Sequence, residues 1–127
     1  MTLSQRIIIV DDERSVRNGL SNLLESEGYA TAAFSSAEAL LNDDIALADA
    51  AFFIIDVRLK GQSGLELFRE LCHRLRKPLG ILISGDSDED MSWRALESGA
   101  VAFLAKPIEI DMLFYHIRRE LTSGETD

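Results

Sequence analysis

Four ionisable side chains stand directly after short apolar runs of this sequence. They are Asp11 and Asp12 after residues 7–10, Asp56 after residues 52–55, and Lys106 after residues 101–105. Apolar runs of this length are typical of buried parallel strands, and the carboxyl ends of such strands share one edge of a sheet. Carboxylates that meet there repel one another unless a cation joins them. A hard divalent cation with a nearby lysine is the usual equipment for handling a phosphoryl group.

Asp56 is the predicted nucleophile of this set. A carboxylate can attack phosphorus and form an acyl phosphate, provided that a metal ion draws charge from the phosphoryl oxygens. Asp11 and Asp12 can complete the protein's share of an Mg²⁺ site, because Mg²⁺ prefers oxygen ligands and retains some waters. Lys106 would pair with Asp56 at rest and with a phosphoryl oxygen afterwards. A single aspartate after a strand is more often a turn or cap residue, so the hypothesis depends on finding all three aspartates and the lysine at strand ends of one sheet.

The elements that must position these residues alternate along the chain. Strands are predicted at residues 6–10, 29–34, 51–55, 79–83 and 101–104, each followed by a helical pattern. Five such repeats imply an α/β fold with a parallel sheet covered on both faces. Right-handed crossovers leave few topologies. The strand order 2-1-3-4-5 is inferred from the fold class, since spacing alone does not fix it, and it places the first and third strands side by side. The three aspartates would then share the crevice between those strands.

Capping residues and periodicity predict where the helices lie and which side chains they bury. Ser35 with Glu38 and Ser63 with Glu66 form capping-box patterns that open the second and third helices. The last helix is predicted at residues 109–121. Trp93 could be either a core residue or an exposed contact. The residues predicted to face the core on the last three helices are Phe68, Leu71, Cys72 and Leu75, then Met91, Ala95 and Leu96, then Ile110, Leu113, Phe114, Ile117 and Leu121.

Length and composition narrow the class of protein. The chain has 127 residues, of which 46% are hydrophobic, and a net charge of −9 from 13 basic and 22 acidic residues. These values predict one globular domain, at residues 1–121, with a polar tail or linker from 122 to 127, and argue against direct binding of nucleic acid or an anionic membrane. One cysteine excludes an internal disulfide. Without a signal peptide or a membrane-length apolar run, a cytoplasmic location is expected.

Four stretches of the sequence resemble, in order and spacing, the landmarks of the receiver domains of two-component response regulators. They are residues 8–13, 55–59, 83–85 and 99–107. The resemblance covers nearly the whole chain and implies the flavodoxin-like (βα)5 three-layer fold of the CheY-like superfamily. It also implies that Asp56 accepts a phosphoryl group from a histidine kinase. In that family pattern, Asp12, Asp56 and the carbonyl of Arg58 would bind Mg²⁺ directly, and Asp11 would act through water.

The same resemblance implies a conformational switch. Ser84 stands at the position that would hydrogen-bond the phosphoryl group, and Phe103 at the aromatic position that would turn inward in response. Chemistry alone also allows Ser84 to be a turn cap and Phe103 to be ordinary core packing. The peptide between Lys106 and Pro107 would be cis. The implied output is a change on the face of the last two helices and the strand between them. This change would alter homodimerisation or the docking of an output domain or protein partner.

Three positions depart from the family pattern or are expected to tune it. Lys60 stands where the family usually has proline, so the loop before the third helix should be less restrained. Arg58 and Asp86 each lie two positions past a site residue. We expect them to pair across the mouth of the site and to alter the access of water to the phosphoryl group.

Other functions stay open at this stage. The chain could be the receiver part of a DNA-binding transcription regulator, with a linker starting at Thr122. A Mg²⁺-dependent phosphohydrolase with an aspartyl intermediate usually needs a second carboxylate two residues past the nucleophile, where Arg58 stands. A receiver that no longer accepts phosphate is disfavoured by the intact acidic and lysine positions. No enzymatic activity is expected beyond self-phosphorylation and self-dephosphorylation.

Overall fold

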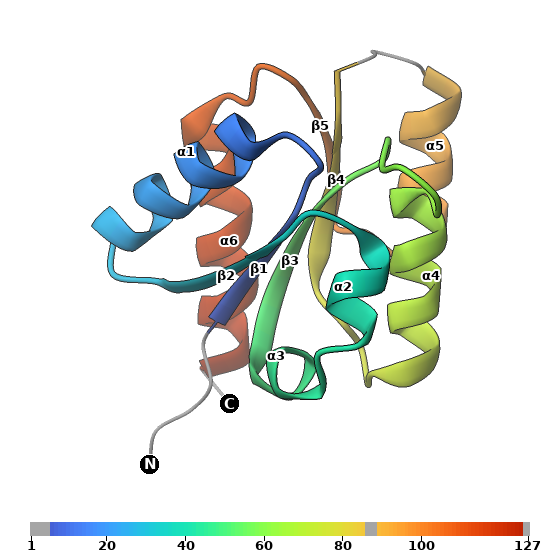
Figure 1. The fold of residues 1–127 in the computed structure, drawn as a ribbon. Helices are drawn as coiled ribbons and strands as arrows, with labels where there is room; N and C mark the ends of the chain where they lie inside the picture. The colour runs from blue at the N-terminus through green and yellow to red at the C-terminus, as the bar shows by residue number, and fades with distance from the viewer. Residues whose placement is uncertain (1–5, 86–88, 126–127) are drawn as a thin grey trace.

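The computed structural model describes residues 6–85 and 89–125. In this part of the chain a five-stranded parallel sheet lies between two layers of helices (Figure 1). The strands are β1 (Arg6–Val10), β2 (Ala30–Phe34), β3 (Ala50–Asp56), β4 (Gly80–Ser84) and β5 (Ala102–Ala105). Their order, β2-β1-β3-β4-β5, and the parallel direction of every pairing confirm the predicted three-layer topology.

The helices divide between the two faces of the sheet. Helices α1 (Arg14–Ser26) and α6 (Ile110–Glu125) cover one face, and α2 (Ala37–Leu41), α4 (Gly64–Arg74) and α5 (Glu89–Glu97) cover the other (Figure 1). The short helix α3 (Asp44–Asp49) precedes β3. No helix among the described residues is both long enough and apolar enough to cross a membrane.

The core consists of one apolar layer on each side of the sheet. Alternate residues of one strand enter opposite layers: Ile8 packs with Phe68 of α4, whereas Ile9 packs with Leu24 of α1. Because both faces are covered, the central strands β1, β3 and β4 need apolar residues at nearly every position, which explains their apolar runs in the sequence, whereas the edge strand β2 is only partly buried. The strand ends are therefore where polar side chains can stand.

The region of the predicted second helix differs from the expectation. Ser36, not Ser35, caps α2, since its hydroxyl accepts a hydrogen bond from the backbone N–H of Ala39 at 3.1 Å. The chain then leaves the helix, and the Asp43 carboxylate accepts from the N–H of Ala46 at 3.0 Å to open α3, which was not predicted. Asparagine and aspartate favour such breaks because their side chains bond nearby backbone groups in non-helical conformations. The predicted capping box of Ser63 and Glu66 is confirmed at the start of α4.

Three predicted core residues are exposed instead. Cys72 is exposed because it follows Leu71, the last residue of the buried stripe of α4, and is turned about 100° away from it. Leu96 and Ile110 are each 48% exposed, since Leu96 lies beside the buried Ala95 and Ile110 is the first residue of α6. The two alternatives for Trp93 are decided, because its side chain is 63% exposed on α5.

Element bounds differ little from the sequence-based expectation. Each strand end lies within one residue of its predicted position. Helix α6 continues to Glu125, four residues past the predicted end of the last helix. The domain boundary at residue 121 stays a prediction.

Candidate functional site

Three carboxylates converge where β1 and β3 end. Asp11 and Asp12 follow β1, Asp56 is the last residue of β3, and the two strands are paired with Val10 opposite Ile55. One carboxylate oxygen from each aspartate lies within 4.8 Å of the other two. Asp11 is fully buried, Asp56 is 4% exposed and Asp12 is half-buried. The structure thus brings together the three acidic residues that the sequence predicted to meet.

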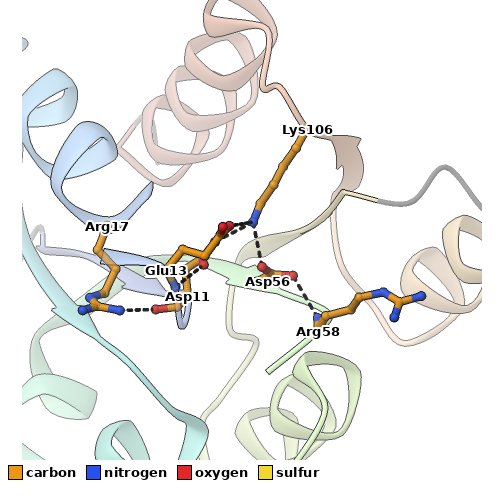
Figure 2. Close-up of polar contacts among 6 residues, drawn as sticks. All are labelled: Asp11, Glu13, Arg17, Asp56, Arg58 and Lys106. Carbon is orange, nitrogen blue, oxygen red and sulfur yellow. Dashed lines mark hydrogen bonds and ion pairs between the residues drawn. The ribbon is translucent and has the colours of Figure 1, made fainter. Parts of the chain in front are cut away.

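Lys106 follows β5, which β4 separates from β3, and its side chain reaches the cluster along the same edge of the sheet. Its Nζ donates a hydrogen bond to Oδ2 of Asp56 at 2.8 Å and lies 3.0 Å from Oδ2 of Asp11 (Figure 2). The lysine is anchored by its backbone N–H, which donates to the carbonyl of Ser84 at 2.8 Å. The peptide bond between Lys106 and Pro107 is cis, as expected. One ammonium group therefore lies at a cluster of three carboxylates, those of Asp11, Asp12 and Asp56.

The electrostatics of the site leave an excess of negative charge. Burial raises the pKa of the Asp11 carboxyl above its ordinary value; the backbone hydrogen bond from Glu13 and the contact with Lys106 offset only part of this rise, and the nearby Asp56 charge adds a smaller rise. Burial lowers the pKa of Lys106, but its contacts with Asp56 and Asp11 and the attraction of their charges together outweigh burial, so its pKa lies above the ordinary value. The ammonium consequently stays charged at neutral pH.

The donor set fits a hard divalent cation. Oδ2 of Asp11 is buried and forms an ion pair with Lys106 but accepts no hydrogen bond from any described residue. That ammonium is shared with Asp56, so one positive charge faces two buried carboxylates, and a further cation would be favourable there. The ligand atoms offered by Asp11, Asp12 and Asp56 are carboxylate oxygens. Hard cations such as Mg²⁺ and Ca²⁺ prefer oxygen ligands, whereas softer metals prefer sulfur or nitrogen.

Backbone groups hold the two buried carboxylates in position. The N–H of Glu13 donates to Oδ1 of Asp11 at 2.9 Å, and the N–H of Arg58 donates to Oδ1 of Asp56 at 2.8 Å (Figure 2). The guanidinium of Arg17 donates to the backbone carbonyl of Asp11 at 2.7 Å. In both aspartates Oδ1 is bound by the local loop, so Oδ2 is the atom turned toward Lys106.

Three contributors to the site were missed by the sequence interpretation. Glu13 places Oε1 3.3 Å from Nζ of Lys106, and Arg17 supports the loop after β1. At Gly64 a Cβ atom would collide with the carbonyl oxygen of Asp56. The capping box at residue 63 indicated where α4 begins, but no local pattern indicates this close approach. The position of Glu13 directly after two acidic residues was the one available signal.

The remaining predicted residues lie around the cluster. Ser84 is 2% exposed at the end of β4, and Phe103 of β5 is half-buried against the layer that contains Phe68. The Arg58 side chain points away from Asp56 (Figure 2). Lys60 is exposed. Asp86, the expected partner of Arg58, lies outside the described residues. A cavity of about 340 Å³ is lined by the residues that directly follow Asp56 and by others, namely Val57, Arg58, Leu59, Gly61, Ser63, Ser84 and Met91.

Comparison with known proteins gives a consistent result. The model of the response regulator receiver domain matches residues 7–118. The chain is 40% identical to response regulator protein TmoT of Ectopseudomonas mendocina over 115 residues, which are 91% of this chain and 52% of that protein. It is 36% identical to transcriptional regulatory protein FixJ of Azorhizobium caulinodans over 121 residues, 95% of this chain and 57% of that protein. The chain thus spans about half the length of these curated relatives.

A solved structure shows the same fold over the full length. The crystal structure of a CheY-like response regulator receiver domain protein from Methanospirillum hungatei superposes with a TM-score of 0.84 at 25% sequence identity. The match covers 98% of both chains. The arrangement of elements around the acidic cluster is therefore shared with an experimentally determined receiver.

Proposed function

This chain belongs to the response regulator receiver domain family, and from that membership we propose that Asp56 is the residue that accepts a phosphoryl group from a histidine kinase. One observation carries the assignment to Asp56. Its carboxylate is the one that combines a place in the three-aspartate cluster with a 2.8 Å hydrogen bond to Lys106. The nucleophile and the cation that must balance its new charge are thus already in contact.

The proposed reaction is a phosphoryl transfer without a redox change. A carboxylate oxygen of Asp56 forms a bond to phosphorus while the bond from phosphorus to the phosphohistidine nitrogen breaks, and the electron pair stays on that nitrogen. The product is an acyl phosphate on a buried side chain. The ammonium of Lys106 then pairs with a phosphoryl oxygen, since phosphorylation adds negative charge at the same place.

We propose Mg²⁺ as the cofactor of this site. Asp11, Asp12, Asp56 and the backbone carbonyl of Arg58 would hold it, with Asp11 acting through water. When bound, the ion supplies positive charge that offsets the repulsion between the incoming phosphoryl group and the carboxylates. The meeting of three carboxylates at the single ammonium of Lys106 supports a further cation in the cluster.

The proposed output passes through Ser84 and Phe103 to the face formed by α5, β5 and α6. Phosphorylation would bias a two-state equilibrium of this face and so change homodimerisation or the docking of an output domain. FixJ is by its name a transcriptional regulatory protein, and the chain covers 57% of it. We therefore propose transcription as the process that this receiver controls within a longer protein, with residues 1–121 as the receiver itself.

Incubation with acetyl phosphate and Mg²⁺, followed by intact-mass measurement, tests the assignment. We expect one added phosphoryl group in the wild-type protein and none in Asp56→Asn, because the amide is not a nucleophile toward phosphorus. Removing Mg²⁺ with a chelator should abolish the addition. Asp44→Asn, an exposed aspartate in the first turn of α3, is the matched control and should still be phosphorylated.

Two results would contradict the proposal. If the Asp56→Asn variant were phosphorylated, the acceptor would be a residue other than Asp56. Steady multiple turnover of simple phosphate esters would instead indicate a phosphohydrolase. Such enzymes usually have a second carboxylate two residues past the nucleophile, where this chain has Arg58.

A further inference from the structure

Lys106 contacts a third carboxylate that the metal cluster does not include. Its Nζ lies 2.8 Å from Asp56, 3.0 Å from Asp11 and 3.3 Å from Oε1 of Glu13. The first two side chains are buried, whereas that of Glu13 is 61% exposed. Glu13 is thus the outermost of the three carboxylates around the ammonium (Figure 2).

The backbone of Glu13 is fixed, but its carboxylate has no structural task in the loop. The backbone N–H donates to Asp11 at 2.9 Å, and the backbone carbonyl accepts from Arg17 at 3.1 Å. Glu13 occupies the N-cap position of α1, yet its side chain makes no capping hydrogen bond. Among the described residues, the contact with Lys106 is the one that this carboxylate makes.

An ammonium group has three N–H donors, and three carboxylates surround this one. A phosphoryl group on Asp56 brings three acceptor oxygens to the place where Lys106 now has one partner, so the ammonium must turn toward it, and its contacts with Asp11 and Glu13 compete with that turn. Asp11 cannot leave, because it is fully buried and held by its loop. Glu13 can move into solvent without breaking any other contact described here.

We propose that Glu13 competes with the phosphoryl group for Lys106 and thereby slows the phosphorylation of Asp56. The proposal rests on the proposed function of Asp56 and deepens it by adding a positioning residue. Glu13 holds the ammonium in its resting place through the contact between Oε1 and Nζ. It acts on the reaction through Lys106 and touches neither phosphorus nor the attacking oxygen.

Two substitutions separate the contact from the charge. Glu13→Gln removes the charge at constant size, and Glu13→Asp keeps the charge but is one methylene too short for the contact. We expect both to be phosphorylated by acetyl phosphate about 1.5- to 5-fold faster at saturating Mg²⁺, the range that corresponds to loss of an exposed ion pair. The increase should shrink at high salt because exposed pairs are screened.

A second readout needs neither metal nor phosphate. In metal-free protein, an amine-acylating reagent should label Lys106 faster in both Glu13 variants, measured against the exposed Lys60 in the same peptide digest. Glu109→Gln is the matched control, since this exposed glutamate stands three residues after Lys106 and loses the same charge. Its phosphorylation rate and its labelling ratio should equal those of the wild type.

Unchanged or slower phosphorylation of both Glu13 variants would overturn the proposal, and so would an unchanged labelling ratio. A fast rate in Glu13→Gln with a wild-type rate in Glu13→Asp would assign the effect to charge rather than to the contact with Lys106, which also overturns it. The proposed function fails separately, if Asp56→Asn is phosphorylated like the wild type. The two ideas are therefore distinguishable in one series of samples.

Discussion

At the scale of single residues, the site depends on one ammonium placed among several carboxylates. Lys106 contacts Asp56 and Asp11, whose side chains are 6% and 0% exposed. Buried charges are tolerated when they are paired, and removing one partner leaves the other uncompensated. Lys106 should therefore contribute to the stability of the resting protein as well as to the proposed reaction.

Replacing Lys106 tests this dual role. Lys106→Met keeps the aliphatic length but leaves two buried carboxylates without their cation, so we expect a loss of about 3 kcal/mol in the free energy of unfolding in metal-free buffer. Mg²⁺ at ten times its dissociation constant should recover about 1.4 kcal/mol by mass action. Urea denaturation with a chelator and with Mg²⁺ measures both values.

Lys60→Met is the control for this prediction. Lys60 is exposed, and its replacement should change the free energy of unfolding by less than about 0.5 kcal/mol. If the Lys106 and Lys60 variants lost the same amount, the cluster would not depend on its lysine.

At the scale of elements, the junction between β3 and α4 controls where Asp56 stands. Asp56 ends β3, and Gly64 begins α4 with its N–H bound to the carbonyl of Val57 at 2.8 Å. A Cβ at Gly64 would collide with the Asp56 carbonyl and would lie 2.9 Å from Cγ2 of Ile55. The helix can pack this closely on the strand because residue 64 has no side chain.

Gly64→Ala should therefore destabilise the protein, although alanine is the better helix former. We expect a loss of about 2 kcal/mol, typical of overpacking against backbone, and slower phosphorylation because the strand end must shift. Thermal unfolding and acetyl phosphate labelling measure the two effects.

Gly19→Ala is the matched control with the opposite sign. Gly19 lies inside α1 with nothing near its missing Cβ, so alanine there should stabilise by about 0.5–1 kcal/mol. A stabilising effect at Gly64 as well would show that the close approach to Asp56 is unimportant.

At the scale of the whole molecule, the proposed signal must travel from the strand ends to a helical face. Trp93 is the one tryptophan of the chain, and it is 63% exposed on α5. Phe103 lies half-buried on β5 against the apolar layer that also includes Met91 of α5. Indole fluorescence therefore reports on the face that the switch is proposed to alter.

Phosphorylation should change the emission of Trp93 in the wild-type protein. The change should vanish in Asp56→Asn and decrease in Ser84→Ala, because the second variant lacks the hydroxyl proposed to bind the phosphoryl group. Spectra taken before and after addition of acetyl phosphate to the Mg²⁺-containing protein measure it. An equal change in Asp56→Asn would trace the signal to the reagent and would contradict the switch.

Local pattern predicted much of this architecture. Buried strands need apolar runs, so the runs before Asp11, Asp56 and Lys106 revealed three strands of a parallel sheet and the edge where polar residues meet, whereas the strand order came from the fold class. Helix faces were predicted less well. Cys72 and Leu96 fit an apolar period, yet each lies at the flank of its helix, and the width of a buried stripe depends on what packs against it.

The sequence by itself determined the fold class and predicted the convergence of three aspartates and one lysine, because apolar runs of a few residues mark the buried strands and the carboxyl ends of parallel strands share one edge. Tertiary structure alone decided that Glu13 reaches Lys106, that Arg17 supports the Asp11 carbonyl, and that Gly64 lies against Asp56. Glu13 and Lys106 are 93 residues apart along the chain. Contacts of this kind depend on distances between separate elements, which no local spacing of residues contains.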